Sequence, residues 1–247
     1  MANPTLQEGV LKNDSFHTLN GEHAMTINGT IFKTCFLGLM AMATFSYTWY
    51  LILTGFTDKA IMLSQWGMWG ALALVLLICF GPKNKFLILT TPLYALCEGL
   101  LLGFVSAIAN KYYPGVATQA ALGTFFALFG MFFFYKTGLI KCTDKFRMVI
   151  FNATFAIFWI YAAQLVVSFF NISIPQIFSN SPIGIGFSLI VVAIATLNLI
   201  IDFDNIERYA GNVDKHLEWY FGFSLMVTII WMYIEILNLL MKLQSRD

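Results

Sequence analysis

The chain has 247 residues, of which 59% are hydrophobic and only 11% are charged. Soluble domains contain roughly half apolar and about a quarter charged residues, so this composition excludes a soluble globular protein and a disordered chain. The 14 Lys and Arg nearly balance the 13 Asp and Glu, so the net charge gives no indication of a nucleic-acid partner. We therefore expect an integral membrane protein with the lipid bilayer as its main partner.

Seven apolar stretches are long enough to cross the hydrocarbon layer as helices, which takes about 20 residues each. They do not alternate polar and apolar residues as the strands of a membrane barrel do. The sequence thus predicts an all-α integral membrane protein with seven transmembrane helices. Their expected bounds are Ile31–Leu53, Ile61–Phe80, Phe86–Ala109, Val116–Tyr135, Met148–Phe170, Ile183–Ile201 and Trp219–Met241.

The polar residues 1–30 lack the basic and apolar regions of a signal peptide. We expect them to form a cytoplasmic tail, followed by one seven-helix domain over residues 31–247. Lys33 lies one turn inside the first stretch, where we expect its ammonium to reach back to the interface.

Positive charges predict the orientation, because cytoplasmic loops are enriched in Lys and Arg. Ten of the 14 cations fall on the side of the N-terminus, which predicts a cytoplasmic N-terminus and a C-terminus outside. These ten are Lys12, Lys33, Lys83, Lys85, Lys136, Lys141, Lys145, Arg147, Arg208 and Lys215, and the other four are Lys59, Lys111, Lys242 and Arg246.

The residue types that usually carry catalysis show no pattern of an enzyme. The three histidines, His17, His23 and His216, lie outside the predicted spans, so an intramembrane Ser–His hydrolase would have no histidine at depth. There is no HExxH motif of a zinc protease, and the four cysteines have neither zinc spacing nor a disulfide pattern. We expect no enzymatic activity and no tightly bound cofactor.

Several polar residues lie within or at the edge of the sixth and seventh apolar stretches, where an ionisable group is costly and commonly functional. Asp202 closes the sixth stretch, Asp204 follows it, and Glu235 lies inside the seventh. Asn198 and Asn238 lie about one helical turn from an acid, on the same face. Carboxylate and amide oxygens suit hard cations, and close carboxylates tend to share a proton. This pattern favours a path for Ca²⁺ or protons, while interhelical hydrogen bonding is the alternative role for the amides.

Glu98 is the thirteenth of 24 residues in the third stretch, close to the expected middle of the membrane, and Tyr94 precedes it by one turn. Two roles stay open for Glu98. It could be a second cation ligand in the same cavity, or a neutral acid that hydrogen-bonds to a neighbouring helix.

Four segments carry a family resemblance. They are YALCEGLLLGFVSA from Tyr94, YPGVATQAALGTF from Tyr113, LNLIIDFDNIE from Leu197 and WMYIEILNLLMKL from Trp231. Together they resemble the transmembrane Bax inhibitor family in its bacterial branch, over roughly residues 31–243. The resemblance implies a seven-helix bundle in which the last helix is central, located in the inner membrane of a bacterium.

The resemblance also implies a pH-sensitive Ca²⁺ leak, gated by an acidic pair that shares a proton when closed. The motif of the sixth helix falls on Asp202 and Ile206, and that of the seventh helix falls on Tyr233, Glu235 and Asn238. Calcium and protons are then permeant or regulatory ions, with Asp202 and Glu235 as transient Ca²⁺ ligands.

This chain departs from the family's pattern at two positions, and the predicted spans keep the two gate acids far apart. The family has Asp where this chain has Glu235, and the family's arginine late in the second helix has no match, with Lys83 as the nearest cation and candidate substitute. At about 1.5 Å per residue, the predicted spans hold Asp202 and Glu235 about 20 Å apart. The pairing therefore depends on the resemblance alone.

Two other functions are possible for a membrane protein of this kind. Some bacterial relatives regulate membrane-bound proteases, so the alternative is a non-transporting regulator that binds a membrane protease or another stress-response partner through residues 1–30. Such a protein would tolerate neutralisation of its acids. A proton-coupled transporter would need an inverted repeat, and none is visible in the sequence. Both for the Ca²⁺ leak and for the regulator, we expect a monomer or a weak oligomer.

Overall fold

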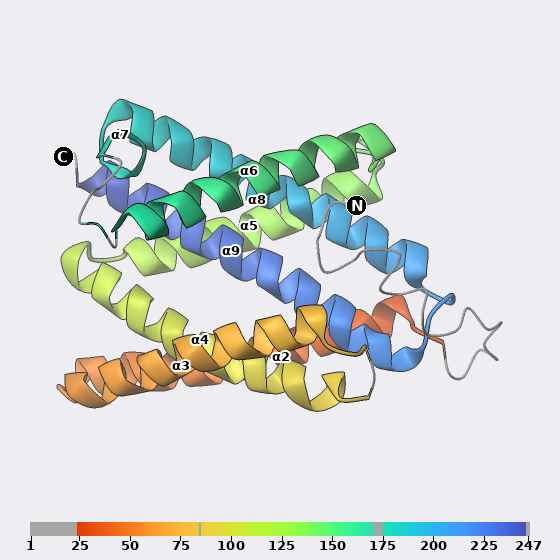
Figure 1. The fold of residues 1–247 in the computed structure, drawn as a ribbon, viewed down its shortest axis with the longest axis horizontal. Helices are drawn as coiled ribbons and strands as arrows, with labels where there is room; N and C mark the ends of the chain where they lie inside the picture. Colours follow the sequence, from red (N-terminus) through yellow and green to blue (C-terminus); the bar gives the residue numbers. More distant parts are fainter. Residues whose placement is uncertain (1–23, 84, 169, 171–174, 246–247) are drawn as a thin grey trace. The chain divides into compact units, whose positions relative to one another are not determined.

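The computed structural model describes residues 24–83, 85–168, 170 and 175–245. Within these residues, seven helices are long and apolar enough to cross a membrane, which confirms the predicted number (Figure 1). They are α2 (Ile27–Leu53), α3 (Thr57–Phe80), α4 (Leu87–Tyr112), α5 (Val116–Lys136), α6 (Asp144–Ser168), α8 (Pro182–Tyr209) and α9 (Glu218–Gln244). The short helix α7 (Pro175–Phe178) precedes α8, and the 3-10 helix η2 (Lys215–Leu217) precedes α9. Residues 1–23 of the predicted tail lie outside the described residues.

Most helix bounds lie within four residues of the prediction, and the largest difference is at the end of the sixth long helix. The sixth long helix, α8, runs eight residues beyond its predicted end at Ile201. It continues through Asp202 and Asn205, which are only 3% and 2% exposed and therefore belong to the interior rather than to a loop. The helix α2 begins at Ile27, four residues before the predicted bound, because the Thr26 hydroxyl accepts a hydrogen bond from the amide of Gly29 and caps its first turn.

The chain forms two compact units, and α8 and α9 contribute to both. The α2–α4 unit contains α2, α3, α4, η2, α8 from Asp204 onward and α9 up to Val227. The α5–α6 unit contains α5, α6, α7, α8 up to Phe203 and α9 from Thr228 onward. The helix that was expected to be central thus supplies residues to both units, and every contact described below lies within one of them.

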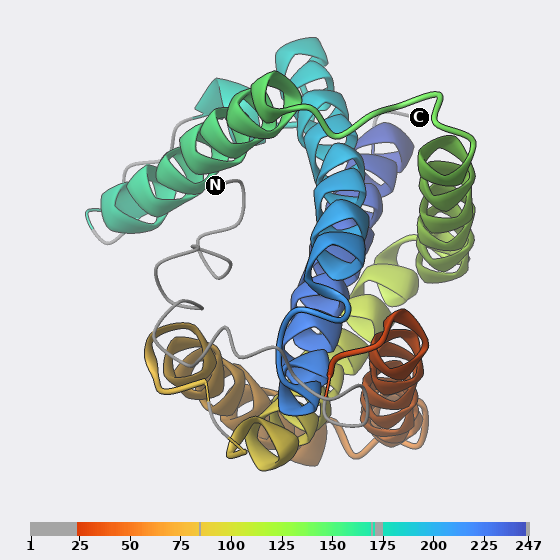
Figure 2. The same ribbon diagram turned by 90° about the vertical axis from the view of Figure 1, so that its right-hand side faces the viewer.

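In the α2–α4 unit, the segment before α2 pairs with the turn between α8 and α9 (Figure 2). The amide of Met25 donates to the carbonyl of Val213, and the amide of Gly211 donates to the carbonyl of Met25, both at 2.8 Å. These backbone hydrogen bonds bring the start of α2 to the start of α9.

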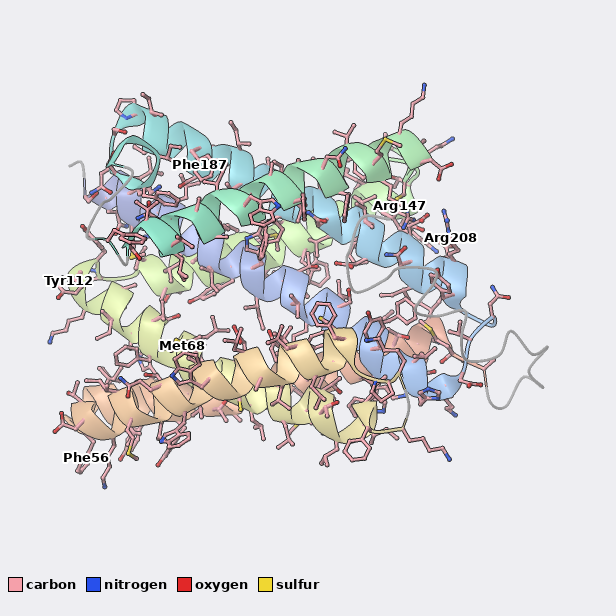
Figure 3. All side chains as sticks on the ribbon, in the orientation of Figure 1. Phe56, Met68, Tyr112, Arg147, Phe187 and Arg208 are labelled. Atoms are coloured by element: carbon pink, nitrogen blue, oxygen red, sulfur yellow. The ribbon has the colours of Figure 1, made fainter. Side chains whose placement is uncertain are left out.

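Large apolar side chains are widely exposed on the long helices (Figure 3). Phe32, Trp66 and Phe126 are 70–72% exposed, and Met68, labelled in Figure 3, is 40% exposed. Apolar surface of this extent marks a site of protein or membrane contact. On helices long enough to cross the bilayer, it indicates contact with lipid, so the chain is an integral membrane protein.

Candidate functional site

The acid predicted inside the last helix is held by two aromatic side chains. Glu235 on α9 is 3% exposed. The hydroxyl of Tyr161 on α6 donates to both carboxyl oxygens, at 2.9 and 3.0 Å. The indole nitrogen of Trp231, one turn earlier on α9, donates to one of them at 3.1 Å. The carboxyl group is therefore fixed from two helices.

Rings on neighbouring helices hold Tyr161 in place. Its ring centroid lies 5.7 Å from that of Phe178 on α7 and 6.3 Å from that of Phe187 on α8. Phe187 is labelled in Figure 3, and its ring is in turn 6.2 Å from that of Phe178. This aromatic cluster limits the rotation of the Tyr161 side chain, which keeps its hydroxyl directed at Glu235.

The second predicted gate residue, Asp202, is held by a different hydroxyl. It lies on α8, seven residues before the helix ends at Tyr209, and is 3% exposed. The hydroxyl of Thr228 on α9 donates to its carboxyl group at 2.5 Å. The contact joins α8 to α9 within the α5–α6 unit.

Asp202 contacts α9 through Thr228, and Glu235 lies on α9 itself at a different level. Thr228 and Glu235 are seven residues apart on α9, which places them on one face, two turns or about 10 Å apart along the axis. The carboxyls therefore lie closer than the 20 Å given by the predicted spans. Among the described residues, the hydrogen bonds of Glu235 go to Tyr161 and Trp231, so the structure does not join the two acids as a hydrogen-bonded pair.

The structure gives Asn198 and Asp204 partners other than the two gate acids. Asn198 on α8, 8% exposed, donates to the Thr154 hydroxyl on α6 at 2.8 Å, which is the interhelical hydrogen bond expected as its alternative role. Asn238 is half-buried on α9. Asp204 forms an ion pair with Arg208 one turn later on α8, at 3.3 Å, and Arg208 is labelled in Figure 3.

Glu98 lies in the α2–α4 unit and accepts a hydrogen bond from Tyr94 on its own helix. The ring of Tyr94 packs edge-on against Phe223 of α9, with centroids 4.9 Å apart. This partner lies one turn away on the same helix, so both roles expected for Glu98 stay predictions.

Lys83 caps the end of α3. The side chain is 4% exposed, and its ammonium donates to the carbonyls of Ile78 and Cys79 in the last turn of α3. It also lies 4.5 Å from the ring centroid of Tyr220 on α9. Burial lowers the pKa of the Lys83 ammonium, and the charge of the Cys79 thiolate partly offsets that shift. These contacts show a helix cap stabilised by the negative end of the α3 dipole, rather than a bond to an acid.

The sequence did not indicate a buried ion pair in the α2–α4 unit. The ammonium of Lys33 on α2 contacts the carboxyl of Glu218, the first residue of α9. The backbone amide and hydroxyl of Thr26 also donate to Glu218, at 2.9 and 3.0 Å. A Cβ atom at Gly29 would lie 2.3 Å from this carboxyl, so only glycine allows the approach. Lys33 is therefore paired with an acid, and its position inside an apolar stretch was the signal for a counter-charge.

Three partners of the predicted acids were also not identified from the sequence: Tyr161, Thr228 and Trp231. Trp231 lies one turn from Glu235, and that spacing could have indicated it. Among the described residues, no group of three or more His, Cys, Asp or Glu side chains could hold a metal ion. Any Ca²⁺ bound by Asp202 or Glu235 would then need oxygens from carbonyls, hydroxyls or water.

A protein-family model described as Bax inhibitor 1 like matches residues 3–245. No curated protein and no solved structure matches the chain.

Proposed function

Because the chain belongs to the Bax inhibitor 1 like family, we propose that it forms a pH-sensitive leak for Ca²⁺, gated by Asp202 and Glu235. The observation that carries this proposal is a pair of acids in the same unit, each 3% exposed: Glu235 lies on one face of α9, and Asp202 contacts Thr228 on that face. Each accepts a hydrogen bond from a neutral hydroxyl group.

The physical basis is the cost of burying a carboxylate. Removing a negative charge from water is unfavourable unless hydrogen bonds and counter-charges compensate it, and a proton removes the charge altogether. At low pH the protonated acids fit the closed interior. At higher pH each ionised carboxyl stabilises water or a cation beside it, and carboxylate and hydroxyl oxygens are the ligand types that Ca²⁺ prefers.

This gate differs from a pair that shares one proton. Tyr161 donates to Glu235 and Thr228 donates to Asp202, so different hydroxyl groups hold the two carboxyls, and Thr228 and Glu235 lie about 10 Å apart along α9. We propose that both must ionise before the path between their levels becomes hydrated. The leak should then depend on the two acids jointly.

Calcium flux into liposomes that contain the purified protein tests the proposal. We expect a faster leak at pH 8 than at pH 6, and a leak that no longer changes with pH in Asp202→Asn and in Glu235→Gln. Glu207→Gln is the matched control because Glu207 is an exposed acid on α8. If both variants of the buried acids keep the wild-type rate and pH profile, the gate lies elsewhere and the proposal is wrong.

We further propose a bacterial inner membrane as the location, with the N-terminus in the cytoplasm. The resemblance to the bacterial branch of the family supports the location, and the placement of ten of the 14 cations on the N-terminal side of the predicted spans supports the orientation. The proposal assigns no catalytic reaction to the chain.

A further inference from the structure

A lysine near the end of α9 is held by oxygen atoms of two other helices in the α5–α6 unit. The ammonium of Lys242 donates to the hydroxyl of Ser188 at 2.9 Å, to the carbonyl of Gly184 at 3.2 Å and to the carbonyl of Ile177 at 3.4 Å. Lys242 follows Glu235 by seven residues, so it lies two turns further along the same face. The sequence indicated Lys242 only as a cation that helps to set the orientation.

The junction of α7 and α8 fixes this set of oxygens. A Cβ atom at Gly184 would lie 2.0 Å from the carbonyl oxygen of Ser179 and 3.1 Å from that of Ile177. Any other residue would push the start of α8 away from the end of α7. The close approach through Gly184 therefore holds the carbonyl groups of both helices around the Lys242 ammonium.

Two carbonyls and one hydroxyl are ligands that replace the hydration water of a hard cation. In this structure a side-chain ammonium occupies that place. The same ammonium interacts electrostatically with the carboxyl of Glu235, which binds directly to Tyr161 and Trp231. A metal cation at the Lys242 position would have the same oxygens and the same acid nearby.

We propose that Lys242 is a tethered cation that blocks the end of the path containing Glu235, by filling the oxygen set and repelling permeant Ca²⁺. This inference depends on the proposed leak, and it adds a residue that sets the leak rate. It also predicts that the three oxygens bind a multivalent cation once the ammonium is removed, with the charge of Glu235, two turns earlier on α9, attracting that cation.

The first test compares Ca²⁺ leak at pH 6 in Lys242→Met, which removes the ammonium, and Lys242→Arg, which keeps a charge. We expect Lys242→Met to leak about tenfold faster than the wild type, equivalent to about 1.4 kcal/mol. Lys242→Arg should stay close to the wild type. Lys111→Met is the matched control, because Lys111 is an exposed lysine in the last turn of α4.

The second test measures terbium luminescence in detergent, excited through the aromatic rings beside Glu235, and does not depend on flux. Lys242→Met should gain saturable terbium binding, and the added change Glu235→Gln should abolish it. Gly184→Ala in the Lys242→Met protein should weaken it. Gly186→Ala should not, because no atom lies within 4 Å of a Cβ at Gly186.

The outcomes separate the two proposals. If the wild type leaks but Lys242→Met matches it in both leak and terbium binding, Lys242 only stabilises the helix end and the inference is wrong. If no protein leaks but Lys242→Met gains terbium binding, the cation site stands and the leak function is wrong. Should Lys242→Met fail to give a monodisperse protein, Lys242→Gln replaces it under the same criteria.

Discussion

Neutralising Glu218 should destabilise the α2–α4 unit far more than breaking an exposed ion pair does. Glu218→Gln keeps the shape of the side chain but removes the charge that contacts Lys33. The amide oxygen can still accept hydrogen bonds from Thr26, so the change isolates the ionic part of the contact. Lys33 is then left with the carbonyl of Lys215 at 3.5 Å and the ring of Trp219 at 5.3 Å.

The exposure of the two side chains sets the expected magnitude. Glu218 is 1% exposed and Lys33 is 16% exposed, so the pair is largely removed from water. Removing one partner of a buried pair costs 3–5 kcal/mol, and the partial exposure of Lys33 favours a loss of about 3 kcal/mol. The pair of Arg208 and Asp204 is the internal control, with exposures of 49% and 20%. For Arg208→Met we expect a loss of about 0.5 kcal/mol.

Denaturant unfolding in detergent, followed by circular dichroism, measures these losses. The decisive form is a double-mutant cycle with Glu218→Gln, Lys33→Met and the combined variant, for which we expect a coupling energy of about 2 kcal/mol. A Glu218→Gln protein that unfolds within about 0.5 kcal/mol of the wild type, or two changes that simply add, would refute the reasoning.

Three further predictions concern the remaining parts of the chain. Burial lowers the pKa of Lys83 from 10.5, so the unfolded chain takes up a proton there before the folded chain does as pH falls. Relative to Lys83→Met, the wild type should therefore lose stability as pH drops below 10.5, and parallel stability curves in thermal melts would contradict this. With the other three cysteines changed to alanine, a membrane-impermeant thiol reagent should label Cys142 in inverted vesicles but not in intact cells, and labelling in intact cells would reverse the predicted orientation. Deleting residues 1–23 should leave the Ca²⁺ leak unchanged, whereas loss of a bound membrane protease with no measurable leak in either protein would favour the regulator.

The apolar runs predicted the seven helices because a membrane span needs little more than length and low polarity. The apolar runs gave a wrong helix end where polar residues are buried inside the protein. The helix α8, for example, continues past Ile201 through the buried Asp202 and Asn205. Glu235 could be identified as a site residue because a carboxyl inside an apolar stretch is rare. Its partner Tyr161 could not, since the two are 74 residues apart and no periodicity links them.

The contact of Lys33 with Glu218 also shows that the sequence identifies a buried charge but not its partner. Lys33 lies inside an apolar stretch and so required a counter-charge, but its partner is 185 residues away in what looked like a polar loop. A single sequence indicates which groups are costly to bury, and only the fold shows which groups compensate them. The predicted proton sharing between Asp202 and Glu235 has the same limit, because it depends on a distance between two helices that the lengths of the spans do not determine.

The two buried acids of α9 differ in the donors that hold them, and this difference separates a structural role from a functional one. Glu218 directly contacts a lysine, so a proton on its carboxyl would leave Lys33 unpaired and cost the stability worked out above. Glu235 is contacted by a phenol and an indole, both neutral, while Lys242 acts on it from two turns away and is itself bound by neutral oxygens. Glu235 can therefore gain or lose a proton without breaking a direct ion pair. A change at Glu218 should thus appear first in stability, and a change at Glu235 first in the pH dependence of the leak.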